Sequence, residues 1–217
     1  MIGNKSTVRK VGEHMSFVGM HIMRDGIIAF ADSKATLSFK SGRKVEDIQR
    51  GPIQKIFKNN QFILVTHGNN EIFSEKNKMN IEDYINNKMI DNVSYEDFLH
   101  DFYQDITNCQ TDYNDGLYQF IIGSKNENGK YFLLRCTVQQ GEYIKFSSKN
   151  FGKSVLYGGE QSFCKMYEIQ QFYYDIDIHK YASMLKTFLE KIVEAKDSFS
   201  EIEYNPVGLP INIEIFQ

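Results

Sequence analysis

Two residues that could do chemistry, Ser16 and Asp32, stand at the two ends of one predicted strand hairpin. The stretch Met15–Thr36 reads MSFVGMHIMRDGIIAFADSKAT, which is an apolar run, a turn at Arg24-Asp25-Gly26 and a second apolar run. A serine hydroxyl can act as a nucleophile when a base lies beside it. A carboxylate at the end of a buried strand raises the question of its partner, since a charge is seldom buried alone. Taken by themselves, Ser16 is equally an ordinary surface serine and Asp32 a strand-end turn former.

The rest of the chain supplies strands and helices that could position these residues. Short apolar or alternating segments bounded by Gly, Asn or Asp predict strands. They cover residues 16–23, 26–32, 53–59, 61–68, 117–124, 130–138, 142–148 and 210–216. Apolar residues at helical spacing predict helices over 81–89, 98–106 and 179–195, and the segment 158–174 is expected to be helical after its glycines.

Two local details refine this expectation. Ser94 and Asp97 resemble a capping box at the start of a helix. The polar stretch Leu37–Pro52 is expected to be a surface excursion rather than a strand. The order of strands, helices, strands, helices and a last strand predicts one α+β domain, and two sheets stacked between helical layers would use this order well.

The composition excludes several classes of function. The 217 residues are 41% hydrophobic and carry a net charge of −3, with no basic stripe, so we expect no nucleic-acid partner. No apolar run reaches the ~18 residues of a membrane span, and residues 1–15 lack the apolar core of a secretory signal. The expected protein is soluble and cytoplasmic. Three scattered cysteines and no H-x-x-x-H pair among five histidines predict neither a metal site nor a cofactor.

The hairpin resembles the amino end of proteasome β-type and HslV-like N-terminal nucleophile hydrolases. Mature active subunits of that family begin with Thr, turn at a charged-x-Gly tripeptide and reach a motif similar to A-D-S-R-A-T. In this chain Ser16 stands at the Thr position, and residues 31–36 read A-D-S-K-A-T with no gap between them and Ser16. The resemblance covers nearly all of residues 16–217. It implies a leader over residues 1–15, a single domain over 16–217 and a four-layer αββα sandwich of two antiparallel sheets.

The resemblance also implies the roles of individual residues. The segment QKIFKNNQFILVTHGNNE makes Lys55 the equivalent of the catalytic lysine and Gly68 that of the oxyanion glycine, with an insertion before Lys55. The segment AKDSFS supplies Asp197 and Ser200, which would orient the amino group. The residues implied to line the substrate pocket are Ala35, Ile53, Thr66 and Asn70. His67, beside Gly68, is interpreted as a polar lining residue rather than a base.

In this mechanism one residue supplies both nucleophile and base. The Ser16 hydroxyl would attack, and its own α-amino group would take the proton, which requires that residues 1–15 are removed first. A free amino terminus has a reference pKa of roughly 7.7–8.0, whereas a lysine near 10.4 is almost wholly protonated at neutral pH. Lys55 would favour the neutral amine, and Asp32 would hold Lys55 so that neither charge is buried alone.

The resemblance implies a peptide or protein substrate, a homo-oligomer or ring, and an ATP-driven unfolding partner. Two departures favour an alternative, because Met15 replaces the glycine typical before the nucleophile and Gly159 stands where a catalytic serine is expected. The alternative is an inactive subunit of the same fold that serves in assembly or binding. A third interpretation, an unrelated α+β binding module, stays open.

Overall fold

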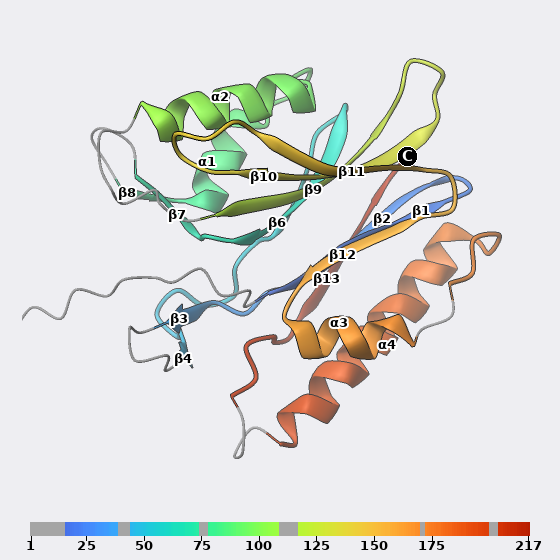
Figure 1. Ribbon diagram of the computed structural model, residues 1–217. Helices are drawn as coiled ribbons and strands as arrows, with labels where there is room; N and C mark the ends of the chain where they lie inside the picture. Colours follow the sequence, from blue (N-terminus) through green and yellow to red (C-terminus); the bar gives the residue numbers. More distant parts are fainter. Residues whose placement is uncertain (1–15, 39–43, 74–77, 109–116, 170–171, 200–203) are drawn as a thin grey trace, which may run out of the picture.

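The computed structural model describes residues 16–38, 44–73, 78–108, 117–169, 172–199 and 204–217, and its core is built around two large antiparallel sheets (Figure 1). In spatial order, the four-stranded sheet holds β12 (Val155–Gly159), β1 (Phe17–Met23), β2 (Gly26–Asp32) and β13 (Ile211–Phe216). The five-stranded sheet holds β11 (Lys145–Phe151), β10 (Tyr131–Val138), β9 (Tyr118–Lys125), β6 (Phe62–Gly68) and β5 (Ile56–Lys58).

Two small sheets and four helices complete the described part of the chain. The small sheets pair β3 (Thr36–Ser38) with β4 (Lys44–Glu46), and β7 (Glu71–Phe73) with β8 (Lys78–Asn80). The helices are α1 (Ile81–Lys88), α2 (Tyr95–Thr107), α3 (Gln161–Glu168) and α4 (Ile178–Asp197). In Figure 1, α1 and α2 lie beside the five-stranded sheet, and α3 and α4 beside the four-stranded sheet.

Period-two alternation along the strands divides the buried side chains among three clusters. In β6, Phe62 and Leu64 pack with α1 and α2, whereas Ile63 and Val65 pack between the two large sheets. In β2, Phe30 likewise packs with α3 and α4, and its neighbour Ala29 packs between the sheets. Both faces of these strands are therefore buried, which explains their nearly continuous apolar sequences.

The hairpin of β1 and β2 forms the centre of the four-stranded sheet. Met23 pairs with Gly26, so the turn consists of Arg24 and Asp25 alone. Gly26 begins β2 rather than belonging to the turn, and it has no positive φ. The glycine is needed for space, because a Cβ at position 26 would lie 2.7 Å from the carbonyl oxygen of Phe216 in β13.

The predicted fold class, an α+β four-layer αββα sandwich of two antiparallel sheets, is wrong as a description of this chain. Strands provide more of the described residues than helices do, and four sheets are present rather than two. Helices α1 and α3 have only eight residues each, so they do not form layers comparable to the sheets. The physical reason is that short strand pairs such as β3–β4 depend on pairing between segments, which a polar sequence does not reveal.

The individual elements agree with the sequence unevenly. Ser94 caps α2 and accepts a hydrogen bond from the backbone N–H of Asp97, as the capping-box pattern predicts. Helix α4 begins at Ile178, close to the predicted start. The expectation for Leu37–Pro52 is wrong, because β3 and β4 fall there. Strand β12 was not predicted, since its two glycines suggested a loop before a helix.

Candidate functional site

The ammonium group of Lys55 and the carboxylate of Asp32 form a buried ion pair at the end of β2. Lys55 Nζ lies 2.8 Å from Asp32 Oδ1, and the two side chains are 2% and 0% exposed. Lys55 precedes β5, in the other large sheet, so the pair joins the ends of strands from both sheets. Burial without water makes a broken pair costly, so each partner constrains the position of the other.

Asp32 also fixes the start of β1, where Ser16 lies. Its Oδ1 accepts a hydrogen bond of 2.8 Å from the backbone N–H of Phe17. The carbonyl oxygen of Ser16 belongs to the same peptide unit and accepts a 2.7 Å hydrogen bond from the N–H of Glu160. Both polar atoms of the Ser16–Phe17 peptide are therefore held, from β2 on one side and from the start of α3 on the other. We call this arrangement the Ser16 clamp.

Gly159 makes the Ser16 clamp sterically possible. It pairs with Phe17 in the β1–β12 ladder and has φ +119°, a conformation that side chains disfavour. A Cβ at this position would lie 1.6 Å from the carbonyl oxygen of Ser16. The serine that the resemblance implies at position 159 therefore cannot be accommodated, because the backbone of Ser16 occupies its space.

Lys34 connects the ion pair to the C-terminal segment. Its N–H donates to Asp32 Oδ2 at 3.2 Å, and its carbonyl oxygen accepts from Lys55 Nζ at 3.1 Å. Its own ammonium donates to the carbonyl oxygen of Asn205 at 3.0 Å and lies 5.0 Å above the ring of Tyr204. Glu46 lies 3.5 Å from the same ammonium. The backbone of Lys34 thus contacts the ion pair, and its side chain contacts the C-terminal segment.

Burial dominates the electrostatics of Lys55. Desolvation lowers the pKa of Lys55 below its ordinary value, and the attraction and hydrogen bond of Asp32 oppose that change. A lysine so placed holds a proton less strongly than an exposed one. Its charge depends on the Asp32 carboxylate beside it, and it would act on any group that binds or forms near Ser16.

The predicted oxyanion glycine ends β6 at a close backbone approach. Gly68 has φ +99°, and a Cβ there would lie 2.6 Å from the carbonyl oxygen of Leu117. Its neighbour His67 is 4% exposed, and the imidazole Nε2 lies 2.8 Å from where a Cβ of Gly158 would be. His67 therefore packs against β12 one residue before Gly159.

The four predicted pocket residues have different surroundings. Ile53 donates its N–H to the carbonyl oxygen of Ser33 at 2.7 Å, and Ala35 accepts a hydrogen bond from the N–H of Asp47 at 3.0 Å. Asn70 accepts at its carbonyl oxygen from the N–H of Ile81. Thr66 follows the alternation of Phe62 and Leu64, whose side chains lie on the α1 and α2 side of β6. Of these four residues, Ile53 lines the groove that Lys55 also borders.

The two residues predicted near the end of α4 differ in outcome. Asp197 is the last residue of α4, and its Oδ1 accepts a 2.7 Å hydrogen bond from Nδ2 of Asn205. Ser200 lies outside the described residues, as do the predicted leader residues 1–15. The structure thus links Asp197 to Asn205 rather than directly to Ser16.

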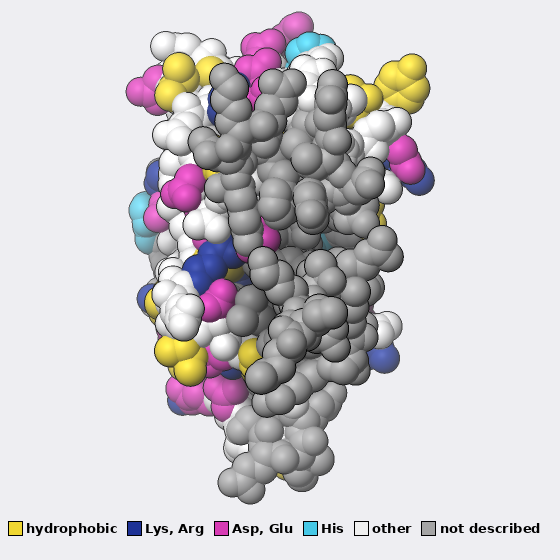
Figure 2. All heavy atoms as spheres, turned by 90° about the vertical axis from the view of Figure 1, so that its left-hand side faces the viewer, with side chains coloured by type: hydrophobic (Ala, Val, Ile, Leu, Met, Phe, Trp, Pro, Cys, Tyr) yellow, Lys and Arg dark blue, Asp and Glu magenta, His cyan; other side chains and the backbone are white. Residues whose placement is uncertain are grey.

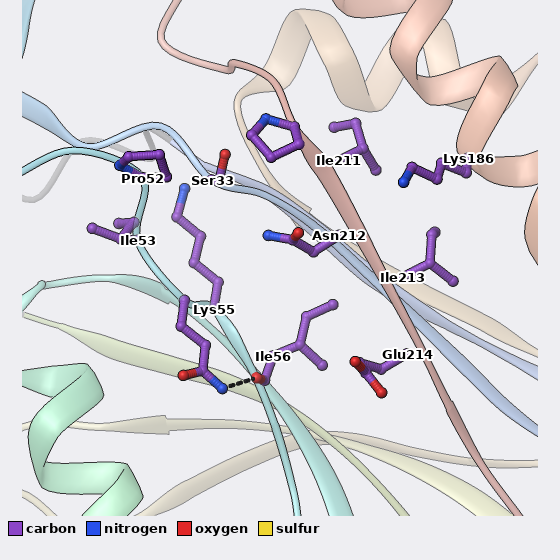
Figure 3. A pocket seen from close by; sticks show the side chains of 12 residues that line it. Ser33, Pro52, Ile53, Lys55, Ile56, Lys186, Ile211, Asn212, Ile213 and Glu214 are labelled. Atoms are coloured by element: carbon purple, nitrogen blue, oxygen red, sulfur yellow. Dashed lines mark hydrogen bonds between the residues drawn. The ribbon is translucent and has the colours of Figure 1, made fainter.

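A groove of about 460 Å³ opens beside the ion pair, between β13 and the segment that leads into β5 (Figure 3). Its wall includes Ser33, Ile53 and Lys55, and the Lys55 side chain points toward Ser33 in this view. Gln54 donates to the carbonyl oxygen of Ile56 at 2.9 Å and so covers part of the strand edge. Polar groups from both large sheets therefore border one hollow.

On the face seen in Figure 2, the described basic and acidic side chains lie beside one another rather than in separate patches. Within the described residues, no three His, Cys, Asp or Glu side chains come together in a way that could hold a metal ion. None of the helices in this part of the chain is long and apolar enough to cross a membrane.

Sequence reasoning missed Asn205, Lys34 and Tyr204 as parts of the site. Asn205 is 1% exposed and accepts at Oδ1 from the N–H of Val207, which is a local Asx-type turn. The only sequence signal was the dipeptide Asn205-Pro206, which is typical of turns. Lys34 lay within the quoted motif but was given no role of its own.

Comparison with solved structures identifies relatives in fold. The chain is similar to Anbu (ancestral beta-subunit) from Yersinia bercovieri, with a TM-score of 0.50 and 13% identity over 92% of this chain and 80% of that one. The Anbu (Gly-1) mutant from Hyphomicrobium sp. strain MC1 gives a TM-score of 0.48 at 12% identity, over 93% and 81% of the two chains. No protein-family model and no curated protein matches the chain.

These findings correct the assignment drawn from the hairpin. The resemblance to proteasome β-type and HslV-like hydrolases is wrong at the level of the family, because these structural relatives are Anbu proteins, which are proteasome-like but form a distinct family. A short hairpin motif indicates a fold but does not single out one family, because every family with that fold needs the turn and the buried strand ends. At 13% identity, the likeness shows that this chain has the fold of an Anbu protein.

Proposed function

We propose that this chain is a proteasome-like subunit that hydrolyses amide bonds with Ser16 as an N-terminal nucleophile, after residues 1–15 are removed. The observation that carries the proposal is the pair of hydrogen bonds that Asp32 Oδ1 accepts, one from Lys55 Nζ and one from the N–H of Phe17. A buried ion pair contributes little to stability compared with apolar residues of similar size. Its position next to Ser16 is more readily explained by chemistry than by folding.

The proposed reaction uses the α-amino group that leader removal creates. The Ser16 hydroxyl oxygen adds to the carbonyl carbon of the substrate amide while its proton passes to this amine. The tetrahedral intermediate then collapses, the amide C–N bond breaks, and the leaving amine takes the proton. Water hydrolyses the resulting ester and regenerates Ser16. A positive Lys55 beside the amine would disfavour its protonation and keep it available as a base.

Two further roles belong to this proposal. The N–H of Gly68 would donate to the oxyanion of the tetrahedral intermediate, a contact typically worth about 3 kcal/mol. Ala35 and Ile53, which are buried and apolar, would favour a peptide with an apolar side chain before the cleaved bond. The substrate is therefore a peptide or an unfolded protein, and confinement within an oligomer would limit cleavage to chains that can enter it.

The intact mass of purified protein tests the proposal, with Ser16→Ala as the matched control. We expect the wild type to lose residues 1–15 and the control to retain them. The processed wild type should then react at Ser16 with phenylmethylsulfonyl fluoride and cleave short apolar peptides. A processed chain that neither reacts at Ser16 nor cleaves peptides would instead support the inactive subunit. Analytical ultracentrifugation of the wild type and of Ser16→Ala measures the oligomeric state of each protein.

Two observations favour the inactive subunit as a second candidate. Asp197, which would orient the amino group, accepts a hydrogen bond from Asn205, and the backbone of Ser16 excludes a serine at position 159. An assembly subunit needs only the fold, so it would keep the ion pair without using it. Under this alternative, wild type and Ser16→Ala should assemble equally and should keep or lose residues 1–15 to the same extent.

A further inference from the structure

Asn205 connects Asp197, at the end of α4, to Lys34, which contacts both members of the ion pair. Its side-chain Nδ2 donates to Asp197 Oδ1 at 2.7 Å, and its main-chain carbonyl oxygen accepts from Lys34 Nζ at 3.0 Å. Asn205 is 1% exposed, so these groups have little access to water that could replace either contact. The side chain of Asn205 therefore contacts one charged residue of the candidate site, Asp197, and its main chain contacts another, Lys34.

The side chain of Asn205 also determines where its own backbone points. Oδ1 accepts a 3.2 Å hydrogen bond from the N–H of Val207, so both ends of the carboxamide are bound. With the carboxamide fixed between Asp197 and Val207, the carbonyl oxygen of residue 205 is directed at Lys34. Gly208 then passes close to Lys34, since a Cβ at position 208 would lie 2.8 Å from its Cδ.

Lys34 transmits this constraint to the ion pair through its main chain. Its N–H donates to Asp32 Oδ2, and its carbonyl oxygen accepts from Lys55 Nζ. The Lys55 ammonium therefore has two described acceptors, one of which is positioned by Lys34. A shift of Lys34 would change the position of the Lys55 charge relative to Ser16 without removing any residue of the pair.

We propose that Asn205 is a positioning residue that connects Asp197 to Lys34 and thereby holds Lys55 in place beside Ser16. The inference rests on the proposed function and assigns Asp197 an indirect role. It acts through Asn205 rather than on the amino group of Ser16. The geometry distinguishes this role from simple packing, because it requires a donor at position 205 and an acceptor at position 197.

A donor–acceptor exchange tests the connection in the full-length chain. Asn205→Asp replaces the donor with a carboxylate that faces Asp197, while it keeps an oxygen for the N–H of Val207. Combining Asn205→Asp with Asp197→Asn restores a donor opposite an acceptor in the reverse direction. Asn128→Ala, in the exposed turn between β9 and β10, is the control for an unrelated loss of an amide side chain.

The measurements are the rate of loss of residues 1–15 by mass spectrometry and, on processed protein, the pH profile of Ser16 acylation by phenylmethylsulfonyl fluoride. We expect Asn205→Asp to slow acylation about tenfold and to shift the midpoint of its pH profile, since small displacements of catalytic groups have large effects on rate. The exchange variant should recover to within about threefold of the wild type, because the pairwise contact is restored. Asn128→Ala should keep the wild-type profile.

Each alternative outcome is decisive. An Asn205→Asp chain with wild-type rate and profile would overturn the positioning role. Failure of the exchange variant to recover either folding or acylation would overturn the donor–acceptor connection, including in the case where Asn205→Asp does not fold. A wild type that is not acylated after leader removal would reject the proposed function itself, and this result is obtained before any variant is examined.

Discussion

The hairpin of β1 and β2 contributes two buried polar side chains that the molecule treats in opposite ways. Asp32 is 0% exposed and is ion-paired with Lys55, and its two oxygens accept three described hydrogen bonds. His21 is 1% exposed, and its Nε2 is hydrogen-bonded to the Tyr167 hydroxyl within a group of aromatic rings. One site stabilises charge, and the other excludes it.

The two environments explain this difference. Around Asp32, two backbone N–H groups and an ammonium converge, so both oxygens of the buried carboxylate have donors. Around His21, the rings of Phe30, Phe172 and Tyr181 offer no counter-charge, and burial lowers the pKa of His21 to about 3. Polar residues on one hairpin can therefore serve a charged site at the end of the strands and a neutral, packed one along their length.

The largest expected effect is that of Asp32→Ala. The substitution would leave the Lys55 ammonium buried without its counter-charge and the N–H of Phe17 without its acceptor, and breaking a buried pair in this way costs about 3–5 kcal/mol. Urea unfolding measures the change. Asp25→Ala, on the turn of the same hairpin with a half-exposed side chain, should change stability by less than about 0.5 kcal/mol. Equal effects of the two variants would remove the distinction drawn here.

The intermediate effect is the pH dependence that His21 contributes. Its pKa is 6.5 when exposed and about 3 in the folded chain, so below pH 6.5 the unfolded chain binds more protons. Stability from this residue is complete above pH 6.5 and falls as the pH decreases toward 3, by up to about 1.4 kcal/mol per pH unit. Unfolding at pH 7.5, 6 and 5 should show this slope in the wild type and a smaller one in His21→Phe.

The smallest effect is expected at an exposed pair of the same chemical types. Lys58 Nζ lies 2.6 Å from Glu214 Oε2, and both side chains are nearly half exposed. Solvent screens such pairs, so Lys58→Ala should cost about 0.2–1 kcal/mol, and less at high salt. A double-mutant cycle with Glu214→Ala isolates the pair. A coupling as large as that lost in Asp32→Ala would show that burial is not what distinguishes the two ion pairs.

Some strands could be predicted from local sequence because both of their faces are buried. The runs FVGMHIM and GIIAFAD are apolar throughout, and they form β1 and β2. Strand β12 gave no such signal, since its pairing with β1 joins Gly159 to Phe17, far apart in the sequence. The β3–β4 pair also gave no such signal, because its two strands lie in a polar segment and form by pairing with each other. These strands form because a neighbouring strand pairs with them, and their own composition does not predict them.

The site was accessible in part. The motif that follows Ser16 drew attention to Asp32, and the assignment of Lys55 depended on a resemblance that required an insertion. Their 2.8 Å separation is a fact of the structure, whereas their roles are proposals. The contacts of Asn205 with Asp197 and Lys34 could not be predicted from the sequence, because they depend on how the C-terminal segment packs. The dipeptide Asn205-Pro206 predicts a turn but not which charged side chains the turn contacts.

The Ser16 clamp also sets the order in which the site can form during synthesis. Ser16 is near the beginning of the described chain, but its carbonyl group is held by the N–H of Glu160, and Lys34 is held by Asn205. A ribosome adds roughly 5–20 residues per second, so about 10–40 seconds separate the appearance of Ser16 from that of Asn205. During this interval the hydroxyl is present without the geometry around it. Under the proposed function, Ser16 would therefore gain its surroundings only when nearly the whole chain has been made, and a growing polypeptide would not react with its own serine.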